Sequence, residues 1–261
     1  MMTLLIFIIG LSVGSFLNVV ILRLHEQKNF IKGRSMCPKC KALISWYDNI
    51  PLISFILLKG KCRSCKAKIS WQYPILELVT ALLFLLIWHG HGGSVEILSD
   101  FRFQISDFRL LRDLFFTCIL IIIFVYDLRW YLILDVITIP AILLAFTINV
   151  LLGFSFLNLL LAIVIGAGFF LIQFVVSKGK WIGGGDIRMG ALMGAMLGFP
   201  QICTAIFIAY IFGSLVGITL LASRRKKLSS QIPFGTFLSA GAVIVLVYGK
   251  EILAWYLNFI Y

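Results

Sequence analysis

Long apolar stretches alternate with polar segments along the whole chain. They cover residues 1–22, 75–88, 113–126, 131–152, 156–176, 187–200, 202–222 and 234–248. A helix needs roughly 20 predominantly apolar residues to cross a bilayer, and several of these stretches reach or approach that length. The pattern therefore predicts an all-α polytopic membrane protein with about eight transmembrane helices. Some stretches are shorter than a typical span, so the exact number of spans depends on them.

The composition agrees with a membrane protein and excludes several other classes. Apolar residues make up 61% of the chain and charged residues 13%, and the mean hydropathy is +1.04. Soluble chains are about half apolar and about a quarter charged. The apolar content excludes a disordered chain, the lack of a Gly-X-Y repeat excludes collagen, and the sparse cysteines exclude a disulfide-dense miniprotein.

The basic residues predict how the chain is oriented in the membrane. The net charge is +12, and residues 23–74 contain 11 of the 23 Lys and Arg side chains. Eight spans with the N-terminus outside place 19 of the 23 on one side, which identifies that side as cytoplasmic. Residues 1–22 lack a basic segment before the apolar run and a small-residue cleavage site, so we expect them to be a retained first helix.

Four cysteines in the basic segment have the spacing of a metal site. Cys37 and Cys40 form one C-x2-C pair, and Cys62 and Cys65 form another after a gap of 21 residues. Each pair can direct two thiolates at one ion, and two pairs complete the tetrahedron that Zn²⁺ accepts. The pattern predicts a small zinc-ribbon-like domain. Four thiolates leave no open metal position, so the zinc would be structural.

An internal repeat supports two similar halves of this domain, because residues 37–46 resemble residues 62–71. Disulfides are the alternative, although a reducing cytoplasm disfavours them. A zinc ribbon that binds nucleic acid is a further alternative. Membrane orientation accounts better for the basic residues, so we expect no nucleic acid as partner. Cys118 and Cys203 lie singly in apolar stretches and are expected to be ordinary core residues.

Two aspartates adjoin apolar stretches, where a carboxylate is costly and therefore a candidate functional group. Asp127 follows the stretch 113–126, and Asp186 follows three glycines at residues 183–185. Both are predicted at the cytoplasmic ends of their helices. Two carboxylates at the same membrane depth can share a proton, so that one acts as base and the other as acid.

Each aspartate also has an alternative structural role. Asp186 has the sequence position of a helix N-cap, and Asp127 has Arg129 as a possible ion-pair partner. Asp135 competes for a catalytic role, although it can instead cap or orient the helix that it precedes. A further pattern, glycine at positions 190, 194 and 198, is typical of close helix packing.

These motifs together resemble the type IV prepilin peptidases, which are bacterial intramembrane aspartic proteases of the GxGD kind. The resemblance covers nearly the whole chain. It rests on Gly14 to Val20 with Arg23, the four cysteines, Trp46, Asp48 to Leu52, Ser54, Tyr73 to Leu78, Asp127, Asp135, Gly183 to Asp186 and Ile232 to Gly235. The chain departs from the family at Leu134, where many members have Pro, and in a longer and more polar segment at residues 89–112.

The resemblance implies an enzyme of the bacterial inner membrane with its active site facing the cytoplasm. It implies that Asp127 and Asp186 are the catalytic aspartates and that Asp135 supports them. Its substrates would be prepilins or pseudopilins, cut after a Gly just before their apolar helix. The four cysteines are consistent with the branch that also methylates the new N-terminal residue with S-adenosylmethionine.

The expected organisation is a first transmembrane helix at residues 1–22, a cytoplasmic four-Cys domain at 23–74 and a peptidase core in the lipid bilayer at 75–261. Two other functions remain open from the residues themselves. A proton-coupled transporter would use the aspartates as an ion relay. A zinc-ribbon adaptor would need no catalysis, but it leaves the Gly-Gly-Gly-Asp turn unexplained.

Overall fold

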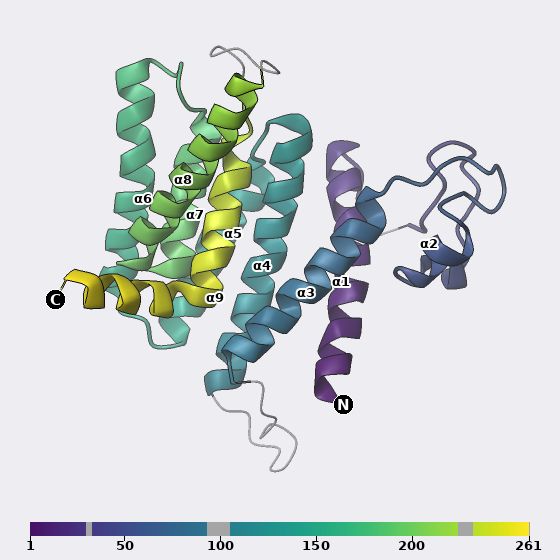
Figure 1. Ribbon diagram of the computed structural model, residues 1–261, viewed down its shortest axis with the longest axis horizontal. Helices are drawn as coiled ribbons and strands as arrows, with labels where there is room; N and C mark the ends of the chain where they lie inside the picture. The colour runs from purple at the N-terminus through teal and green to yellow at the C-terminus, as the bar shows by residue number, and fades with distance from the viewer. Residues whose placement is uncertain (30–32, 93–104, 224–231, 261) are drawn as a thin grey trace. The chain divides into compact units, whose positions relative to one another are not determined.

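Helices are the only regular elements in the part of the chain that the computed structural model describes. It describes residues 1–29, 33–92, 105–223 and 232–260. These residues belong to two compact units, 1–102 and 103–261 (Figure 1). The first contains α1 (Met2–His25), the 3-10 helix η1 (Trp46–Asn49), α2 (Ile53–Leu57) and α3 (Gln72–Gly90). The second contains α4 (Ile105–Trp130), α5 (Asp135–Leu151), α6 (Phe156–Ser177), α7 (Gly184–Leu197), α8 (Gln201–Ala222) and α9 (Phe234–Ile260).

Each predicted apolar stretch corresponds to one of these helices, which confirms the all-helical membrane class. Five helices, α1, α3, α6, α8 and α9, are long and apolar enough to cross a membrane. The helix α4 has 26 residues but carries ionisable side chains near both ends. The helices α5 and α7 have 17 and 14 residues. The total of eight spans therefore stays a prediction.

Several helix boundaries differ from those in the sequence analysis. The helix α9 continues to Ile260 rather than ending near residue 248, and α4 begins at Ile105, inside the polar segment 89–112. Residues 93–104 of that segment lie outside the described part of the chain. The helix α7 is displaced toward the N-terminus and ends at Leu197, because Gly198 has a positive φ of 72°.

In the first unit, α1 and α3 touch backbone to backbone. A Cβ atom added at Gly10 would lie 2.6 Å from the Cα of Ala81, and one at Gly14 would lie 2.7 Å from the Cα of Glu77. Such close approach requires small residues on the facing surfaces. The glycine in the N-terminal motif is therefore a packing residue that brings the two helices together.

Polar side chains join α1 to the start of α3 and attach the four-Cys segment to α3. Asn18 is fully buried, and its Nδ2 donates to the carbonyl of Tyr73 at 3.2 Å. Gln72 Nε2 donates in turn to Asn18 Oδ1 at 3.3 Å. The backbone N–H of Leu52 donates to Glu77 Oε2 at 2.9 Å. Asn18 thus joins α1 to the first residues of α3, and the four-Cys segment is attached to α3 at Leu52, a point inside it.

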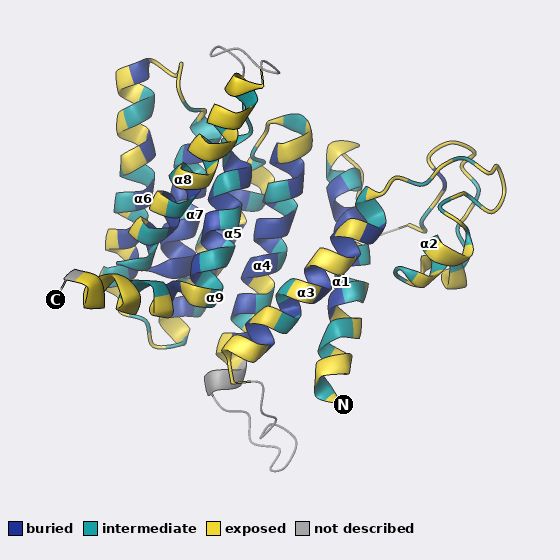
Figure 2. Ribbon diagram, viewed as in Figure 1, coloured by how far each residue is buried: buried dark blue, intermediate teal, exposed yellow. Residues whose placement is uncertain are grey.

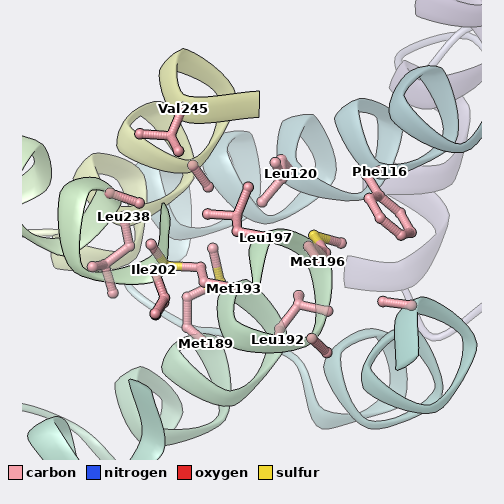
Figure 3. Close-up of a cluster of buried hydrophobic side chains, with 14 of the residues drawn as sticks. Phe116, Leu120, Met189, Leu192, Met193, Met196, Leu197, Ile202, Leu238 and Val245 are labelled. Atoms are coloured by element: carbon pink, nitrogen blue, oxygen red, sulfur yellow. The ribbon is translucent and has the colours of Figure 1, made fainter. Parts of the chain in front are cut away.

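The core of the second unit surrounds the short helix α7. This helix contacts α5, α6, α8 and α9, and most of its residues are buried, as the dark blue ribbon in Figure 2 shows. The side chains labelled in Figure 3 come from α4, α7, α8 and α9 and belong to one buried apolar cluster. The labelled residues are Phe116, Leu120, Met189, Leu192, Met193, Met196, Leu197, Ile202, Leu238 and Val245. Because α7 is enclosed by other helices, its apolar residues face protein on most sides.

Glycines bring α6 and α7 into direct backbone contact. A Cβ at Gly190 would lie 2.3 Å from the carbonyl oxygen of Gly166, and a Cβ at Gly194 would lie 2.4 Å from that of Ala162. Real Cβ atoms essentially never approach this closely. The interpretation of the glycine pattern as helix packing is therefore confirmed for these two positions.

Two asparagines hold the C-terminal end of α7. Asn149 of α5 is fully buried, and its Nδ2 donates to the carbonyls of Ala195 at 2.7 Å and Met196 at 3.0 Å. Asn158 of α6 donates to the carbonyl of Phe199 at 2.9 Å and accepts from its N–H at 3.0 Å. These bonds satisfy polar groups that the end of a helix leaves free, so α7 is fixed at this end.

Candidate functional site

Asp127 lies in the last turn of α4 and is buried, with 4% of its surface exposed. Its Oδ2 accepts two hydrogen bonds from Thr236, one from the backbone N–H at 2.8 Å and one from Oγ1 at 3.2 Å. Thr236 is the third residue of α9, where a backbone N–H has no acceptor within the helix. Asp127 thus supplies a negative group to the positive end of α9. Arg129, the predicted alternative partner, lies instead over the ring of Trp130.

Asp186 occupies the third position of α7 and is also buried, with 7% of its surface exposed. Its Oδ2 accepts the backbone N–H of Gly183 at 2.9 Å, and its own N–H donates to the carbonyl of Gly183 at 3.1 Å. The N-cap of α7 is therefore Gly183, and the prediction of Asp186 as the residue just before the helix is wrong in position. The carboxylate still satisfies one free N–H, because it reaches back across the first turn.

The two aspartates lie close enough for their charges to interact. Ile133, in the connection between α4 and α5, packs between the first turn of α7, which carries Asp186, and the first turn of α9, which binds Asp127. A Cβ at Gly185 would lie 3.0 Å from the Cβ of Ile133, and a Cβ at Gly235 would lie 2.8 Å from its Cδ1. The site is therefore assembled where the end of α4 meets the first turns of α7 and α9.

Asp135, the third candidate from the sequence, has a different environment. It is the first residue of α5, is exposed, and forms an ion pair with Arg188 of α7. Arg188 lies two residues beyond Asp186, so the pair links α5 to the turn that carries that carboxylate. This arrangement suits a residue that orients α7 better than one that reacts.

Aromatic side chains form one wall beside the aspartates. The hydroxyl of Tyr210 on α8 donates to Gln173 Oε1 on α6 at 2.8 Å, and the charge of Asp186 acts on Tyr210. The Tyr210 ring packs edge-on against Phe234, with centroids 5.0 Å apart. Phe234 opens α9, so this contact supports the turn that holds Asp127.

The roles of Thr236 and Ile133 were not predicted from the sequence. Residues 232–235 stood out only as part of the resemblance to a known family. A proline directly before an apolar stretch does signal a helix start, and the free N–H groups of that start were the available clue. Which carboxylate they would bind was not deducible, because Thr236 and Asp127 are 109 residues apart.

The four cysteines of the first unit come together as predicted. Their sulfur atoms all lie within 4.8 Å of one another, and those of Cys37 and Cys65 are 3.9 Å apart. Zn–S bonds of about 2.3 Å in a tetrahedron place sulfurs about 3.8 Å apart. The backbone N–H of Cys40 lowers the pKa of the Cys37 thiol to about 6, which favours the thiolate that binds metal. Four sulfur donors at this spacing fit zinc.

The internal repeat appears as two matching turns. The N–H of Cys37 donates to the carbonyl of Ala42 at 3.0 Å, and the N–H of Cys62 donates to that of Ala67 at 2.8 Å. Each turn presents its pair of cysteines to the other pair. The sequence repeat therefore encodes two equivalent halves of one sulfur cluster.

A bidentate ion pair joins the two halves of this segment. Arg63 donates from Nε to Asp48 Oδ2 at 2.8 Å and from a terminal nitrogen to Oδ1 at 2.6 Å, and it also lies over the ring of Tyr47. The hydrogen bonds from Arg63 lower the pKa of the Asp48 carboxyl. Asp48 belongs to η1 and Arg63 lies between Cys62 and Cys65, so the ion pair ties the short helix to the cysteine-bearing turns.

Comparison with known protein families covers both units. The bacterial peptidase A24 N-terminal domain matches residues 8–90, which include all four clustered cysteines. The type IV leader peptidase family matches residues 114–218, which include Asp127 and Asp186. No solved structure matches the chain.

Three curated relatives match along nearly their whole length. A protein from Aeromonas salmonicida is 32% identical over 97% of this chain and 93% of its own. A protein from Legionella pneumophila is 30% identical over 99% of this chain and 95% of its own. A protein from Bacillus subtilis is 32% identical over 97% of this chain and 97% of its own. All three are named prepilin leader peptidase/N-methyltransferase. This similarity rules out the transporter and adaptor alternatives, and the chain belongs to the type IV leader peptidase family as a membrane-embedded peptidase.

Proposed function

We propose that this enzyme removes the leader from prepilins or pseudopilins by cutting after a Gly at the cytoplasmic face of the bacterial inner membrane. The observation that carries the proposal is the pair of buried carboxylates, Asp127 and Asp186. Each accepts a backbone N–H from the first turn of a helix or the residue before it, and their charges interact. The relatives' names supply the substrate class.

In the proposed mechanism, a water molecule between the two carboxylates attacks the scissile carbonyl. One carboxylate takes a proton from the water, and the other donates a proton to the carbonyl oxygen. Both groups are held away from solvent, where a charge–charge interaction is stronger than in water. No covalent intermediate with the enzyme is needed.

The proposed orientation follows from the basic residues. Eight spans would place the four-Cys domain and both aspartates on the cytoplasmic side, together with residues 224–227. In this arrangement residues 1–22 are the first span, residues 23–74 the cytoplasmic domain and residues 75–261 the peptidase core. The apolar helix of the substrate stays in the bilayer beside its cleavage site.

We further propose a second activity, transfer of a methyl group to the newly exposed N-terminal amine. The relatives' names include N-methyltransferase, and S-adenosylmethionine is the expected methyl donor. When bound, it would supply the methyl group on its sulfonium sulfur, the electron pair of the broken C–S bond would stay on sulfur, and the amine would release a proton to water. The structure assigns no residue to this step.

A direct test of the peptidase is to incubate the purified enzyme with a prepilin-like substrate that has a basic leader and a Gly-Phe junction. Mass spectrometry follows release of the leader, and a substrate with Gly changed to Val at the junction is the control. We expect one cut, after the Gly. If the folded enzyme leaves varied prepilins intact, the proposed function is wrong.

Zinc binding is expected to depend on the cysteine pairs. Cys37, Cys40, Cys62 and Cys65 would hold the ion, whose role is to crosslink the two turns. We expect a Cys62→Ser, Cys65→Ser double variant to lose zinc, because two thiolates cannot complete its tetrahedron. Metal analysis of the purified protein measures this loss.

The matched control is a Cys118→Ser, Cys203→Ser double variant, since these cysteines lie outside the cluster. It should retain the zinc content of the unmodified enzyme. Equal zinc in both double variants would contradict the assignment of the ligands.

A further inference from the structure

We propose that Thr236 is a positioning residue that keeps Asp127 ionised and orients its Oδ1 toward the attacking water, so that Asp127 is the general base and Asp186 the general acid. This inference rests on the proposed function, because that function assigns chemistry to both aspartates. It goes further by distinguishing their roles.

The hydrogen bonds of the two carboxylates are unequal. Asp127 Oδ2 accepts both the N–H and the Oγ1 hydroxyl of Thr236, whereas Asp186 Oδ2 accepts the N–H of Gly183. Donors directed at a carboxylate favour its charged form. When two close carboxylates share one proton, the group with more donors gives it up, so the proton resides on Asp186.

The position of Thr236 protects its hydrogen bonds to Asp127 from competition by water. Its side chain is buried, with 6% of its surface exposed, so water does not readily replace its hydroxyl. A Cβ at the neighbouring Gly235 would lie 3.0 Å from Asp127 Oδ2 and still closer to Ile133. The α9 turn is therefore pressed against the carboxylate, and both Thr236 bonds end on one oxygen. Neither Thr236 bond occupies Oδ1, which is the oxygen that the proposal assigns to the water.

Other ionisable groups around Asp127 do not duplicate this role. On α7, Asp186 interacts with it by charge, while Arg188 pairs with Asp135 of α5. Tyr126 and Arg129 are its neighbours on α4, and Arg129 lies over an aromatic ring. On α9, the next ionisable side chains after Thr236 in the sequence are Tyr248 and Lys250, about three turns away.

The proton transfers balance in this assignment. An O–H bond of water breaks, its proton moves to Asp127 Oδ1, and the oxygen bonds to the scissile carbon. The carbonyl oxygen takes the proton of Asp186. As the C–N bond breaks, Asp127 returns its proton to the leaving nitrogen, and a hydroxyl of the intermediate returns one to Asp186. Both carboxylates recover their starting states.

The test compares Thr236→Val, which keeps the N–H but lacks the hydroxyl, with Thr236→Ser, which restores it. The readout is kcat and KM for prepilin cleavage across pH. With Val we expect the acid limb of the kcat/KM profile to move up by about one pH unit, and kcat to fall roughly tenfold with little change in KM. With Ser we expect the profile of the unmodified enzyme.

Thr117→Val is the matched control, because Thr117 is a fully buried threonine on α4 whose hydroxyl donates to a backbone carbonyl. It should leave the profile unmoved. If Val at position 236 impairs folding, Thr236→Ala gives the same comparison. An unmoved acid limb, or an equal loss at every pH that Ser does not restore, would overturn the role of Thr236. Failure of the unmodified enzyme to cleave would instead contradict the proposed function.

Discussion

Asp127→Asn and Asp186→Asn enzymes are expected to insert and fold normally and to cleave prepilin roughly 10²–10⁴-fold more slowly. An asparagine carbonyl can still accept the N–H of Thr236 or Gly183, so each turn keeps its bond. The amide cannot take a proton from water or hold one for the carbonyl. The loss should therefore appear in kcat, and thermal unfolding should remain close to that of the unmodified enzyme.

Asp135→Asn is the matched control for these variants. It removes a carboxylate that forms an exposed ion pair with Arg188, and exposed pairs contribute about 0–1 kcal/mol. We expect it to retain most of the cleavage rate. Normal cleavage by either of the other variants, or complete loss in a well-folded Asp135→Asn enzyme, would contradict the catalytic assignment.

Gly190→Ala is expected to lower the free energy of unfolding by about 3 kcal/mol or more. The added methyl group would lie 2.3 Å from the carbonyl oxygen of Gly166 and 2.7 Å from a ring carbon of Phe170. The oxygen belongs to helix backbone, which cannot move aside as a flexible side chain can. The helices α6 and α7 must separate, and Asp186 on α7 would lose its position along with them.

Gly168→Ala provides the comparison on α6, because a Cβ there meets nothing within 4 Å. Thermal unfolding in detergent measures both variants, and cleavage activity measures the effect on the site. Gly168→Ala should match the unmodified enzyme within about 1 kcal/mol, since alanine itself is well tolerated in a helix. Equal stability of the two variants would show that the α6–α7 contact is not as close as described.

Local patterns in the sequence were sufficient for the helices and for the cysteine cluster. An apolar run forms a helix in a membrane because its backbone must satisfy its own hydrogen bonds, whatever lies nearby. The two C-x2-C pairs predicted their cluster for a similar reason, since each turn is built from a few consecutive residues. The aspartates stood out because a carboxylate beside an apolar stretch is costly.

The boundaries and surroundings of these elements were less predictable. The helix α7 starts at Gly184, because the Asp186 carboxylate folds back to accept the N–H of Gly183. The run of three glycines did not indicate at which of these residues the helix would begin. The short length of α7 made it a doubtful span. Its burial among four other helices explains why so short a helix is so apolar.

Local sequence patterns were thus enough to predict the class of the protein, its cysteine-bearing turns and the two candidate carboxylates. The hydrogen-bond partners of those carboxylates, in contrast, became evident only from the packing of the helices. Thr236 binds Asp127 across 109 residues, and Ile133 packs between two turns that are far apart in the chain. Such contacts depend on how whole helices pack, and no local periodicity records them. The chemical nature of a carboxylate is set by the residue itself, whereas its hydrogen-bond donors come from helices that are distant in the sequence.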